Sequence, residues 1–334
     1  MTSPSRKFVH LHVHSQYSLL DGAIRIDDLL AQVKKFDMPA VALTDHGTMF
    51  GSIEFYEKAI KAGIKPIIGC ECYVAPRGLT DKTPEDHRGV SHLILLAKDM
   101  EGYRNLCKMV SVAQLEGFYY KPRIDKEILK AHHRGLIGLT ACLHGEIPSL
   151  INHKRLKEAD EAARQYEQLF GEGNFFLEVQ NNGIEIQTTV NDILKDMSQR
   201  LSIPLVASND CHYLEPGHVR AHDVLLCIQT GKTVHDAERL KFRTDQLYLK
   251  SPAEMIDYFK GFPGAIENTV AIAERCNLEF DFGSYHFPNY HTDDGSSEAD
   301  FFERKVRKGF ESIMEAIRAR NPRADESVYR KRLE

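Results

Sequence analysis

The sequence lacks any long apolar run. Its longest apolar stretches, such as residues 39–43 and 93–97, are far shorter than the roughly 20 residues that a membrane-spanning helix needs. Residues 1–7 carry two cations with no apolar segment behind them, so we expect no secretory signal. The seven cysteines are odd in number and form no CxxC pair, which argues against a disulfide framework and a zinc ribbon. We therefore expect a cytoplasmic protein without a membrane partner.

A strong excess of either charge is also missing. The chain of 334 residues has 43 Lys and Arg against 48 Asp and Glu, which gives a net charge of −5 and no basic footprint for nucleic acid. With 42% hydrophobic residues it has enough apolar material for a core, so a disordered or collagen-like chain is excluded. The length fits one large domain or two ordinary ones.

Short apolar runs alternate with amphipathic stretches, a pattern that predicts repeated βα units. Strands are expected at residues 8–14, 40–44, 64–74, 91–97, 135–141, 175–180 and 205–208. Helices are expected at residues 26–36, 52–61, 101–112, 155–170, 186–201 and 219–229. Seven strands with interleaved helices favour an α/β fold of the (β/α) barrel type. An open doubly wound sheet is the alternative, although no GxGxxG motif follows the first strand.

The pattern changes near Cys276. Residues 263–276 predict a closing helix, residues 277–297 form a polar connector with scattered aromatics, and residues 298–320 return to a charged helical pattern. We expect a first domain at residues 1–276 and a second segment at residues 277–334. The polar end of the chain looks like a cut rather than the natural end of a domain.

Three histidines share one face of the first expected strand. His10, His12 and His14 are spaced two apart, so their side chains point the same way. Three buried imidazoles repel one another when charged unless something binds them. This spacing predicts metal ligation by His12 and His14, whereas a structural role is favoured for His10, which lies further from the end of the strand.

Other ligand-type residues lie at or near the ends of the following strands. These motifs are Thr44-Asp45-His46-Gly47, Gly69-Cys70-Glu71-Cys72, Ser91-His92, Thr140-Ala141-Cys142 and Ser208-Asn209-Asp210-Cys211-His212. Each alone has an ordinary interpretation as a turn or a satisfied polar residue. Strand ends of a βα barrel meet on one face, where active sites are built, so together they predict a metal centre there. The mixed nitrogen, oxygen and sulfur ligands suit Zn²⁺, with Mn²⁺ or Fe²⁺ as alternatives.

Further residues near these tips have two interpretations each. Asp21 lies in the loop after the first strand and is either a ligand or a turn residue. Asp45 is either a ligand or a carboxylate that fixes an imidazole tautomer. Glu178 and Asn209 either orient a metal ligand in a similar way or have a purely structural role. The Tyr-Tyr-Lys-Pro-Arg stretch at 119–123 suits a single nucleic-acid strand or a surface loop, and the loop is slightly favoured. Cys70, Cys72 and Cys211 are expected to pack in the core.

The ordered series of motifs resembles the polymerase and histidinol phosphatase (PHP) region of bacterial replicative DNA polymerase III alpha subunits. The resemblance covers essentially the whole chain and is carried by His12-Val-His14, Ser18-Leu-Leu-Asp-Gly22, Thr44-Asp-His-Gly47, Gly63-Ile-Lys-Pro-Ile67, Gly117-Phe-Tyr-Tyr-Lys-Pro-Arg-Ile-Asp125 and Asn209-Asp-Cys-His-Tyr213.

The resemblance implies a distorted (β/α)7 barrel that binds up to three divalent metal ions through nine side chains. Carried across by position, these are His12, His14, Asp21, His46, Glu71, His92, Cys142, Asp210 and His212. Cys142 stands where small phosphatases of the superfamily usually have histidine. The segment after Cys276 corresponds to a short helical stub of the polymerase palm. Because that segment lacks a carboxylate cluster, we expect this chain not to polymerise DNA, although its parent is a DNA-directed DNA polymerase.

Three hypotheses follow from the motifs and the resemblance. The first is a metal-dependent phosphoesterase that acts as a 3′–5′ exonuclease on a single-stranded DNA 3′ end, with Glu71, Asp210 and His212 in catalysis and Glu71 bridging two metals. The second is a metal-stabilised domain that docks a separate proofreading exonuclease (epsilon) subunit and other replicase subunits. The third, least favoured, is a small-molecule phosphatase of the histidinol-phosphate type.

Overall fold

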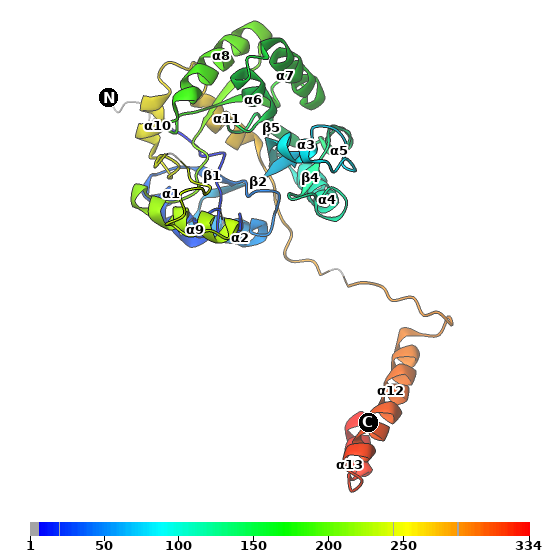
Figure 1. Cartoon of the computed structure of the whole chain (residues 1–334). Helices are drawn as coiled ribbons and strands as arrows, with labels where there is room; N and C mark the ends of the chain where they lie inside the picture. The colour runs from blue at the N-terminus through cyan, green and yellow to red at the C-terminus, as the bar shows by residue number, and fades with distance from the viewer. Residues whose placement is uncertain (1–6, 20, 243, 286) are drawn as a thin grey trace. The chain divides into compact units, whose positions relative to one another are not determined.

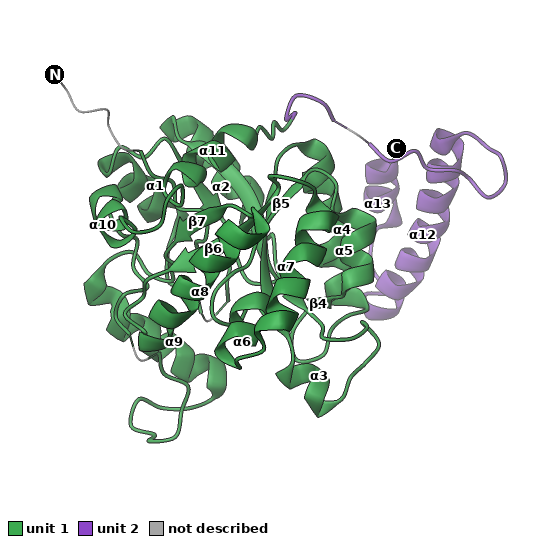
Figure 2. Cartoon of the chain, turned by 90° about the horizontal axis from the view of Figure 1, so that it is seen from above, with its two compact units in different colours: residues 1–280 green, residues 281–334 purple. Residues whose placement is uncertain are grey.

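The computed structural model describes residues 7–19, 21–242, 244–285 and 287–334. Residues 1–6, on which part of the expectation of no secretory signal rests, lie outside these ranges. The chain forms two compact units, residues 1–280 and 281–334 (Figure 2). The second unit contains α12 (Glu298–Arg320) and α13 (Glu326–Leu333), and its assignment to a polymerase palm stays a prediction. Within the described ranges, no helix is long and apolar enough to cross a bilayer.

The first unit is built on a mixed sheet of seven strands. The strands are β1 (Ala40–Leu43), β2 (Lys65–Val74), β3 (Ser91–Ala97), β4 (Arg123–Ile124), β5 (Leu136–Leu139), β6 (Phe175–Gln180) and β7 (Leu205–Ser208). Their order is β1-β2-β3-β5-β6-β7, and β4 pairs with β2. All neighbouring strands are parallel except β3, which runs antiparallel to both β2 and β5. The sheet is therefore a distorted (β/α) arrangement, in which one strand is reversed.

Helices surround the strands on the outside (Figure 1). They are α1 (Ile26–Lys35), α2 (Ser52–Ala62), α3 (Pro84–Arg88), α4 (Met100–Leu115), α5 (Lys126–His132), α6 (Glu146–Asn152), α7 (Leu156–Phe170), α8 (Glu185–Leu201), η1 (Pro216–His218), α9 (Val219–Thr230), α10 (Pro252–Tyr258) and α11 (Glu267–Arg275). In α1, Ile26, Leu29, Leu30 and Val33 are buried at helical spacing, so one face of the helix packs into the large core beside α2.

Both faces of the strands are buried, so β1 is apolar along its whole length and β3 is apolar from Leu93 to Ala97. On β3, Leu93 and Leu95 belong to the large core, while Ile94 and Leu96 belong to a second, smaller core. This second core also includes Ile272 of α11. The expected closing helix is thus present and packs against the side of the sheet opposite the large core.

The segment 8–14, expected as the first strand, is extended but is not a regular strand. It lies between β1 and the chain after β7, because Ala42 N–H donates to His10 O and Cys211 N–H donates to His12 O. The amides of Val9 and Val13, however, donate to threonine hydroxyls and not to a neighbouring backbone. These side-chain bonds interrupt the ladder, so the expectation of a strand was wrong here. The short strand β4 was not expected from the sequence.

Candidate metal centre

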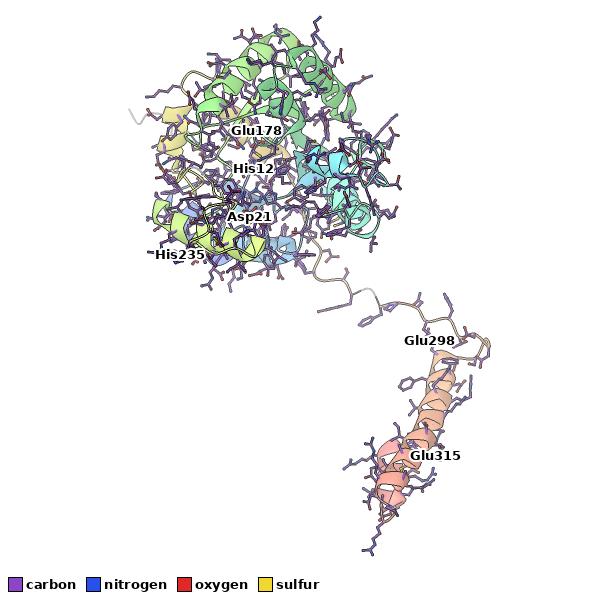
Figure 3. The ribbon with its side chains drawn as sticks, in the orientation of Figure 1. His12, Asp21, Glu178, His235, Glu298 and Glu315 are labelled. Carbon is purple, nitrogen blue, oxygen red and sulfur yellow. The ribbon has the colours of Figure 1, made fainter. Side chains whose placement is uncertain are left out.

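The nine side chains predicted as ligands lie close to one another in the first unit. Figure 3 labels His12 and Asp21 in the middle of this unit, with Glu178 beside them, and His235 at its margin. Four overlapping groups bring ligand atoms within 4.8 Å of one another. These groups are His12, His14, Glu71 and Asp210; His14, His46 and His212; His46, Glu71 and His92; and His92, Cys142 and His144. We call this set, together with Asp21, the metal cluster.

Glu71 lies at the centre of the metal cluster. Its Oε2 lies 3.2 Å from His12 Nε2, 3.0 Å from His14 Nε2 and 3.0 Å from His46 Nδ1. Its other oxygen, Oε1, lies 2.7 Å from His92 Nδ1. A single buried carboxylate therefore faces four imidazoles with both oxygens, which is the arrangement expected of a group that bridges two cations.

Asp210 completes the deepest part of the cluster. Its Oδ1 lies 3.1 Å from His12 Nε2, 3.2 Å from His14 Nε2 and 3.4 Å from His212 Nδ1. The backbone at Asp210 has φ of 50°, in the left-handed region that a residue other than glycine adopts at an energetic cost. Ala141, which precedes Cys142, is held in the same way with φ of 61°. Strained backbone at two strand ends aims side chains into the cluster, as is common at functional sites.

Asp21 joins the cluster from the loop after residues 8–14. Its Oδ2 lies 3.1 Å from His46 Nε2 and 3.8 Å from His212 Nε2. The other oxygen, Oδ1, lies 3.4 Å from Nε2 of His222, a buried residue of α9.

Cys142 lies at the edge of the cluster with two imidazoles. Its Sγ lies 3.7 Å from His92 Nδ1 and 3.8 Å from His144 Nδ1. The residue as a whole is partly exposed, and its sulfur forms no disulfide. This corner adjoins a cavity of about 560 Å³, whose lining includes His144 and Ser91. His144, the imidazole partner of Cys142, thus lines a cavity that is open to solvent.

A layer of polar groups behind the cluster fixes the imidazoles. Glu178 Oε1 lies 2.8 Å from His12 Nδ1, so it directs the Nε2 of this ring towards Glu71 and Asp210. Asp45 acts on His14 through Ser18, whose hydroxyl donates to Asp45 Oδ1 at 3.1 Å and lies 3.0 Å from His14 Nδ1. Neither carboxylate touches the middle of the cluster.

The electrostatics keep the central carboxylates ionised. Burial opposes ionisation of Glu71, yet the His46, His92 and His12 imidazoles hold its pKa well below the usual value. Burial also opposes ionisation of Asp210, but His12 and His212 lower its pKa well below the ordinary range. Conversely, burial disfavours a charged His12, whereas the carboxylates of Asp210, Glu178 and Glu71 raise its pKa well above normal.

Several buried atoms of the cluster make no hydrogen bond. They are Asp21 Oδ1, His46 Nδ1 and Asp210 Oδ1, joined by His222 Nε2 behind Asp21. Each lies 3.0–3.4 Å from an oppositely charged or ring-nitrogen neighbour without hydrogen-bond geometry, as ligand atoms gathered around a common cation would. Carboxylate oxygens and imidazole nitrogens are ligands for first-row divalent metals. The residues present therefore fit bound cations.

Two imidazoles at the site were not predicted from the sequence. His144 follows Cys142 by two residues, a spacing that was available as a signal. His222 lies within a helix and not at a strand end, so no pattern pointed to it. Other predicted neighbours lie apart from the cluster: His10 Nε2 lies 2.8 Å from Lys250 O, and Asn209 accepts from Lys250 Nζ at 3.0 Å. As expected, Cys70, Cys72 and Cys211 are buried in the large core.

Comparison with known proteins identifies close relatives of this chain. Residues 10–182 match the model of the PHP domain family. The chain is 45% identical over 319 residues to the DNA polymerase III subunit alpha of Treponema pallidum, covering 94% of this chain and 27% of that protein. It is 47% identical over 286 residues to the DNA polymerase III subunit alpha of Borreliella burgdorferi, covering 85% of this chain and 25% of that protein. It is 42% identical over 334 residues to the DNA polymerase III subunit alpha of Thermus aquaticus, covering 97% of this chain and 27% of that protein. The chain thus spans about a quarter of the length of these relatives.

Proposed function

The chain belongs to the PHP domain family and is similar to the PHP region of DNA polymerase III alpha subunits, and we propose that its metal cluster hydrolyses phosphodiester bonds at a DNA 3′ end. The single observation that carries this proposal is the geometry of Glu71, which faces four imidazoles and shares two of them, His12 and His14, with Asp210. We propose up to three divalent ions, with Zn²⁺ favoured by the Cys142 corner and Mn²⁺ or Fe²⁺ as alternatives.

The ions would be held by the nine predicted residues. His12, His14 and Asp210 form the deepest group with Glu71, which reaches from there to His46 and His92. When bound, divalent ions lower the pKa of a coordinated water to about 7 and neutralise phosphate oxygens. The buried carboxylates offer ionised oxygens for this purpose without a prior proton loss, because the imidazoles around them depress their pKa values.

The leaving group must receive a proton. Hydrolysis at a 3′ end adds water across the last phosphodiester, breaks the bond between phosphorus and the 3′ oxygen of the preceding nucleotide, and releases a nucleoside monophosphate. Burial disfavours a charged His212, but Asp210 and Asp21 raise its pKa above the ordinary value. A ring nitrogen that coordinates a metal has no proton to give, so we assign this proton to an imidazole of the cluster that holds no ion, and to His212 where the other residues hold the ions.

The test is release of nucleotides from a 3′-labelled single-stranded oligonucleotide by the purified chain with Mn²⁺ or Zn²⁺. Asp210→Asn and His212→Gln are expected to reduce the rate by about 100-fold or more. His235→Gln is the matched control, because that imidazole is exposed and lies at the margin of the unit. If the two cluster variants release nucleotides as fast as the control, the activity belongs to another protein or another site.

A second candidate role is structural. The cluster joins side chains from the loop at Asp21, from β2, from β3 and from the ends of β5 and β7, so bound ions would tie together distant parts of the chain. In this role the domain would dock a proofreading exonuclease subunit or other replicase subunits. Metal removal would then lower the melting temperature, while no metal would support cleavage of any 3′ end. The absence of cleavage, and not the loss of stability, distinguishes this role from the first.

A further inference from the structure

The loop at residues 117–122, which we call the rim loop, lies beside the metal cluster. It follows α4 and leads into β4. Gln114 at the end of α4 donates to Gly47 O at 3.2 Å, and a Cβ placed on Gly47 would meet Pro122 Cγ at 2.7 Å. Gly47 directly follows His46. The rim loop therefore packs against the segment that carries one of the proposed ligands.

Lys121 places an ammonium group at this edge of the cluster. Its Nζ lies 5.2 Å from the centre of the Tyr73 ring. That ring in turn stacks on His46, with centroids 5.7 Å apart, and meets the His92 ring edge-on at 5.1 Å. Within the described ranges, no ion pair to a carboxylate involves Lys121.

The guanidinium of the nearby Arg123 is occupied by hydrogen bonds to backbone carbonyl groups. Arg123 is fully buried, and its guanidinium donates to the carbonyl oxygens of Gly117, Leu79 and Asp81. Its role is to hold the rim loop in shape. Lys121 is therefore the cation of this loop that remains available to an anion.

Tyr120 stands at the apex of the rim loop. The Tyr119 N–H donates to Lys121 O at 3.1 Å, which makes a tight turn, and Tyr120 has φ of 60°. This left-handed conformation is uncommon for an aromatic residue. The ring is 66% exposed and lies 4.3 Å from the exposed His87 ring, at an angle of 33°. The backbone is thus bent to present an aromatic face to solvent.

We propose that the rim loop binds the substrate strand next to the metal cluster, with Lys121 on a phosphate and Tyr120, backed by His87, under a base. This inference rests on the proposed function and names its substrate as single-stranded nucleic acid. Exposed rings interleaved with cations are the usual means of holding a single strand without sequence preference. Small phosphate esters have no base to stack, so the rim loop favours a strand over them.

The experiment measures binding and chemistry separately. Binding is measured by fluorescence anisotropy of a labelled oligothymidylate whose last linkages are phosphorothioates, with the Mn²⁺-loaded full chain over a range of salt concentrations. Chemistry is measured as hydrolysis of bis(p-nitrophenyl) phosphate. Variants are Tyr120→Ala with Tyr120→Phe as rescue, and Lys121→Met with Lys121→Arg. Lys61→Met is the matched control, because Lys61 is exposed in the last turn of α2, ahead of the start of β2.

Tyr120→Ala should weaken binding of the oligonucleotide by about tenfold and have no effect on an abasic strand of equal length. Lys121→Met should reduce the slope of log K against log salt by about 0.7, the value for one phosphate contact on a single strand. The small ester has no strand beyond the reacting linkage, so its hydrolysis should change far less in both variants than oligonucleotide binding does. The Phe and Arg variants should bind as the parent does.

Two outcomes separate the inference from the proposed function. If Tyr120→Ala and Lys121→Met bind the oligonucleotide with the affinity and salt slope of Lys61→Met, the inference is wrong even where the parent cleaves DNA. If the parent hydrolyses neither bis(p-nitrophenyl) phosphate nor the 3′-labelled oligonucleotide with ordinary linkages, the proposed function fails. The anisotropy data alone then decide whether the rim loop binds a strand, because this measurement does not depend on turnover.

Discussion

His92 Nδ1 lies 2.7 Å from Glu71 Oε1, and this contact exists because β2 and β3 run antiparallel. In the register Glu71 pairs with Ile94, and His92 pairs with Tyr73, so Glu71 and His92 are diagonal neighbours on one face. His92 lies near the beginning of its strand. In an all-parallel barrel it would lie at the end of the barrel opposite the other ligands. The reversal of β3 brings it to the same end.

Replacement of Glu71 tests whether this carboxylate organises the metal cluster. Glu71→Gln removes the charge that faces four imidazoles, and we expect the chain to lose bound metal and about 3–5 kcal/mol of unfolding free energy. Metal content by elemental analysis and unfolding by denaturant measure the two effects. Glu57→Gln on the exposed side of α2 is the control and should change neither. Equal metal content in both variants would contradict a bridging role.

Several candidate ligands could be predicted because they lie in or beside apolar runs. His46 follows β1 and Asp210 follows β7, while Glu71 lies within β2 and His12 lies in the irregular segment 8–14. The fold brings these four residues together. Their role as ligands stays a prediction. The sequence alone predicts that these residues gather, because strand ends converge in any βα arrangement.

The remaining features depend on tertiary contacts that no local pattern encodes. Nothing in residues 91–97 distinguishes a parallel from an antiparallel strand. The segment 8–14 has the composition of a strand, but two of its amides donate hydrogen bonds to the hydroxyls of Thr44 and Thr269 and not to a neighbouring strand. His222 reaches Asp21 from a helix, and its place depends on how α9 packs.

The loop at Asp21 offers a test that changes no proposed ligand. Gly22 follows Asp21, and a Cβ on Gly22 would lie 2.0 Å from Ser15 O. Gly22→Ala must therefore displace one of two backbone segments, at a cost of about 1–3 kcal/mol. We expect lower metal affinity together with a lower melting temperature. Gly217→Ala, where the added methyl group meets no atom within 4 Å, should leave both unchanged.

The ion pair between Asp86 and Arg77 is expected to lose its stabilising effect in acid. Arg77 donates to Asp86 Oδ1 at 2.8 Å and Oδ2 at 2.6 Å, and this pairing holds the pKa of Asp86 below its ordinary value of 3.8. Because the folded-state pKa lies below the unfolded one, the contribution is complete above about pH 4 and is lost as pH falls further.

We therefore expect Asp86→Asn to be less stable at neutral pH and to lose less on acidification. Urea unfolding of parent and variant, both with a chelator so that the metal cluster contributes equally, measures the difference between them. This difference should shrink as pH falls below about 4. A difference that stays constant down to low pH would show that the ion pair does not supply it.

Replacement of Cys142 tests whether the edge of the metal cluster binds a separate ion. Its thiol faces His92 and His144, and burial raises its pKa well above the usual value when no cation is present. A bound metal requires the thiolate, so loading should release a proton and make the sulfur unreactive towards a thiol reagent. Cys142→Ser should lower the zinc content by about one ion per chain, because a hydroxyl is a much weaker zinc ligand than a thiolate.

Cys107→Ser is the control for this prediction, because Cys107 is also partly exposed but lies on α4 in none of the four ligand groups. Zinc content should be the same in this variant and in the parent. Since His12, His14 and Asp210 lie in a separate group, Cys142→Ser should keep the ion held there. Loss of all metal from Cys142→Ser would instead mean that the groups fill as one cooperative unit. Equal zinc content in both cysteine variants would mean that the sulfur corner holds no ion.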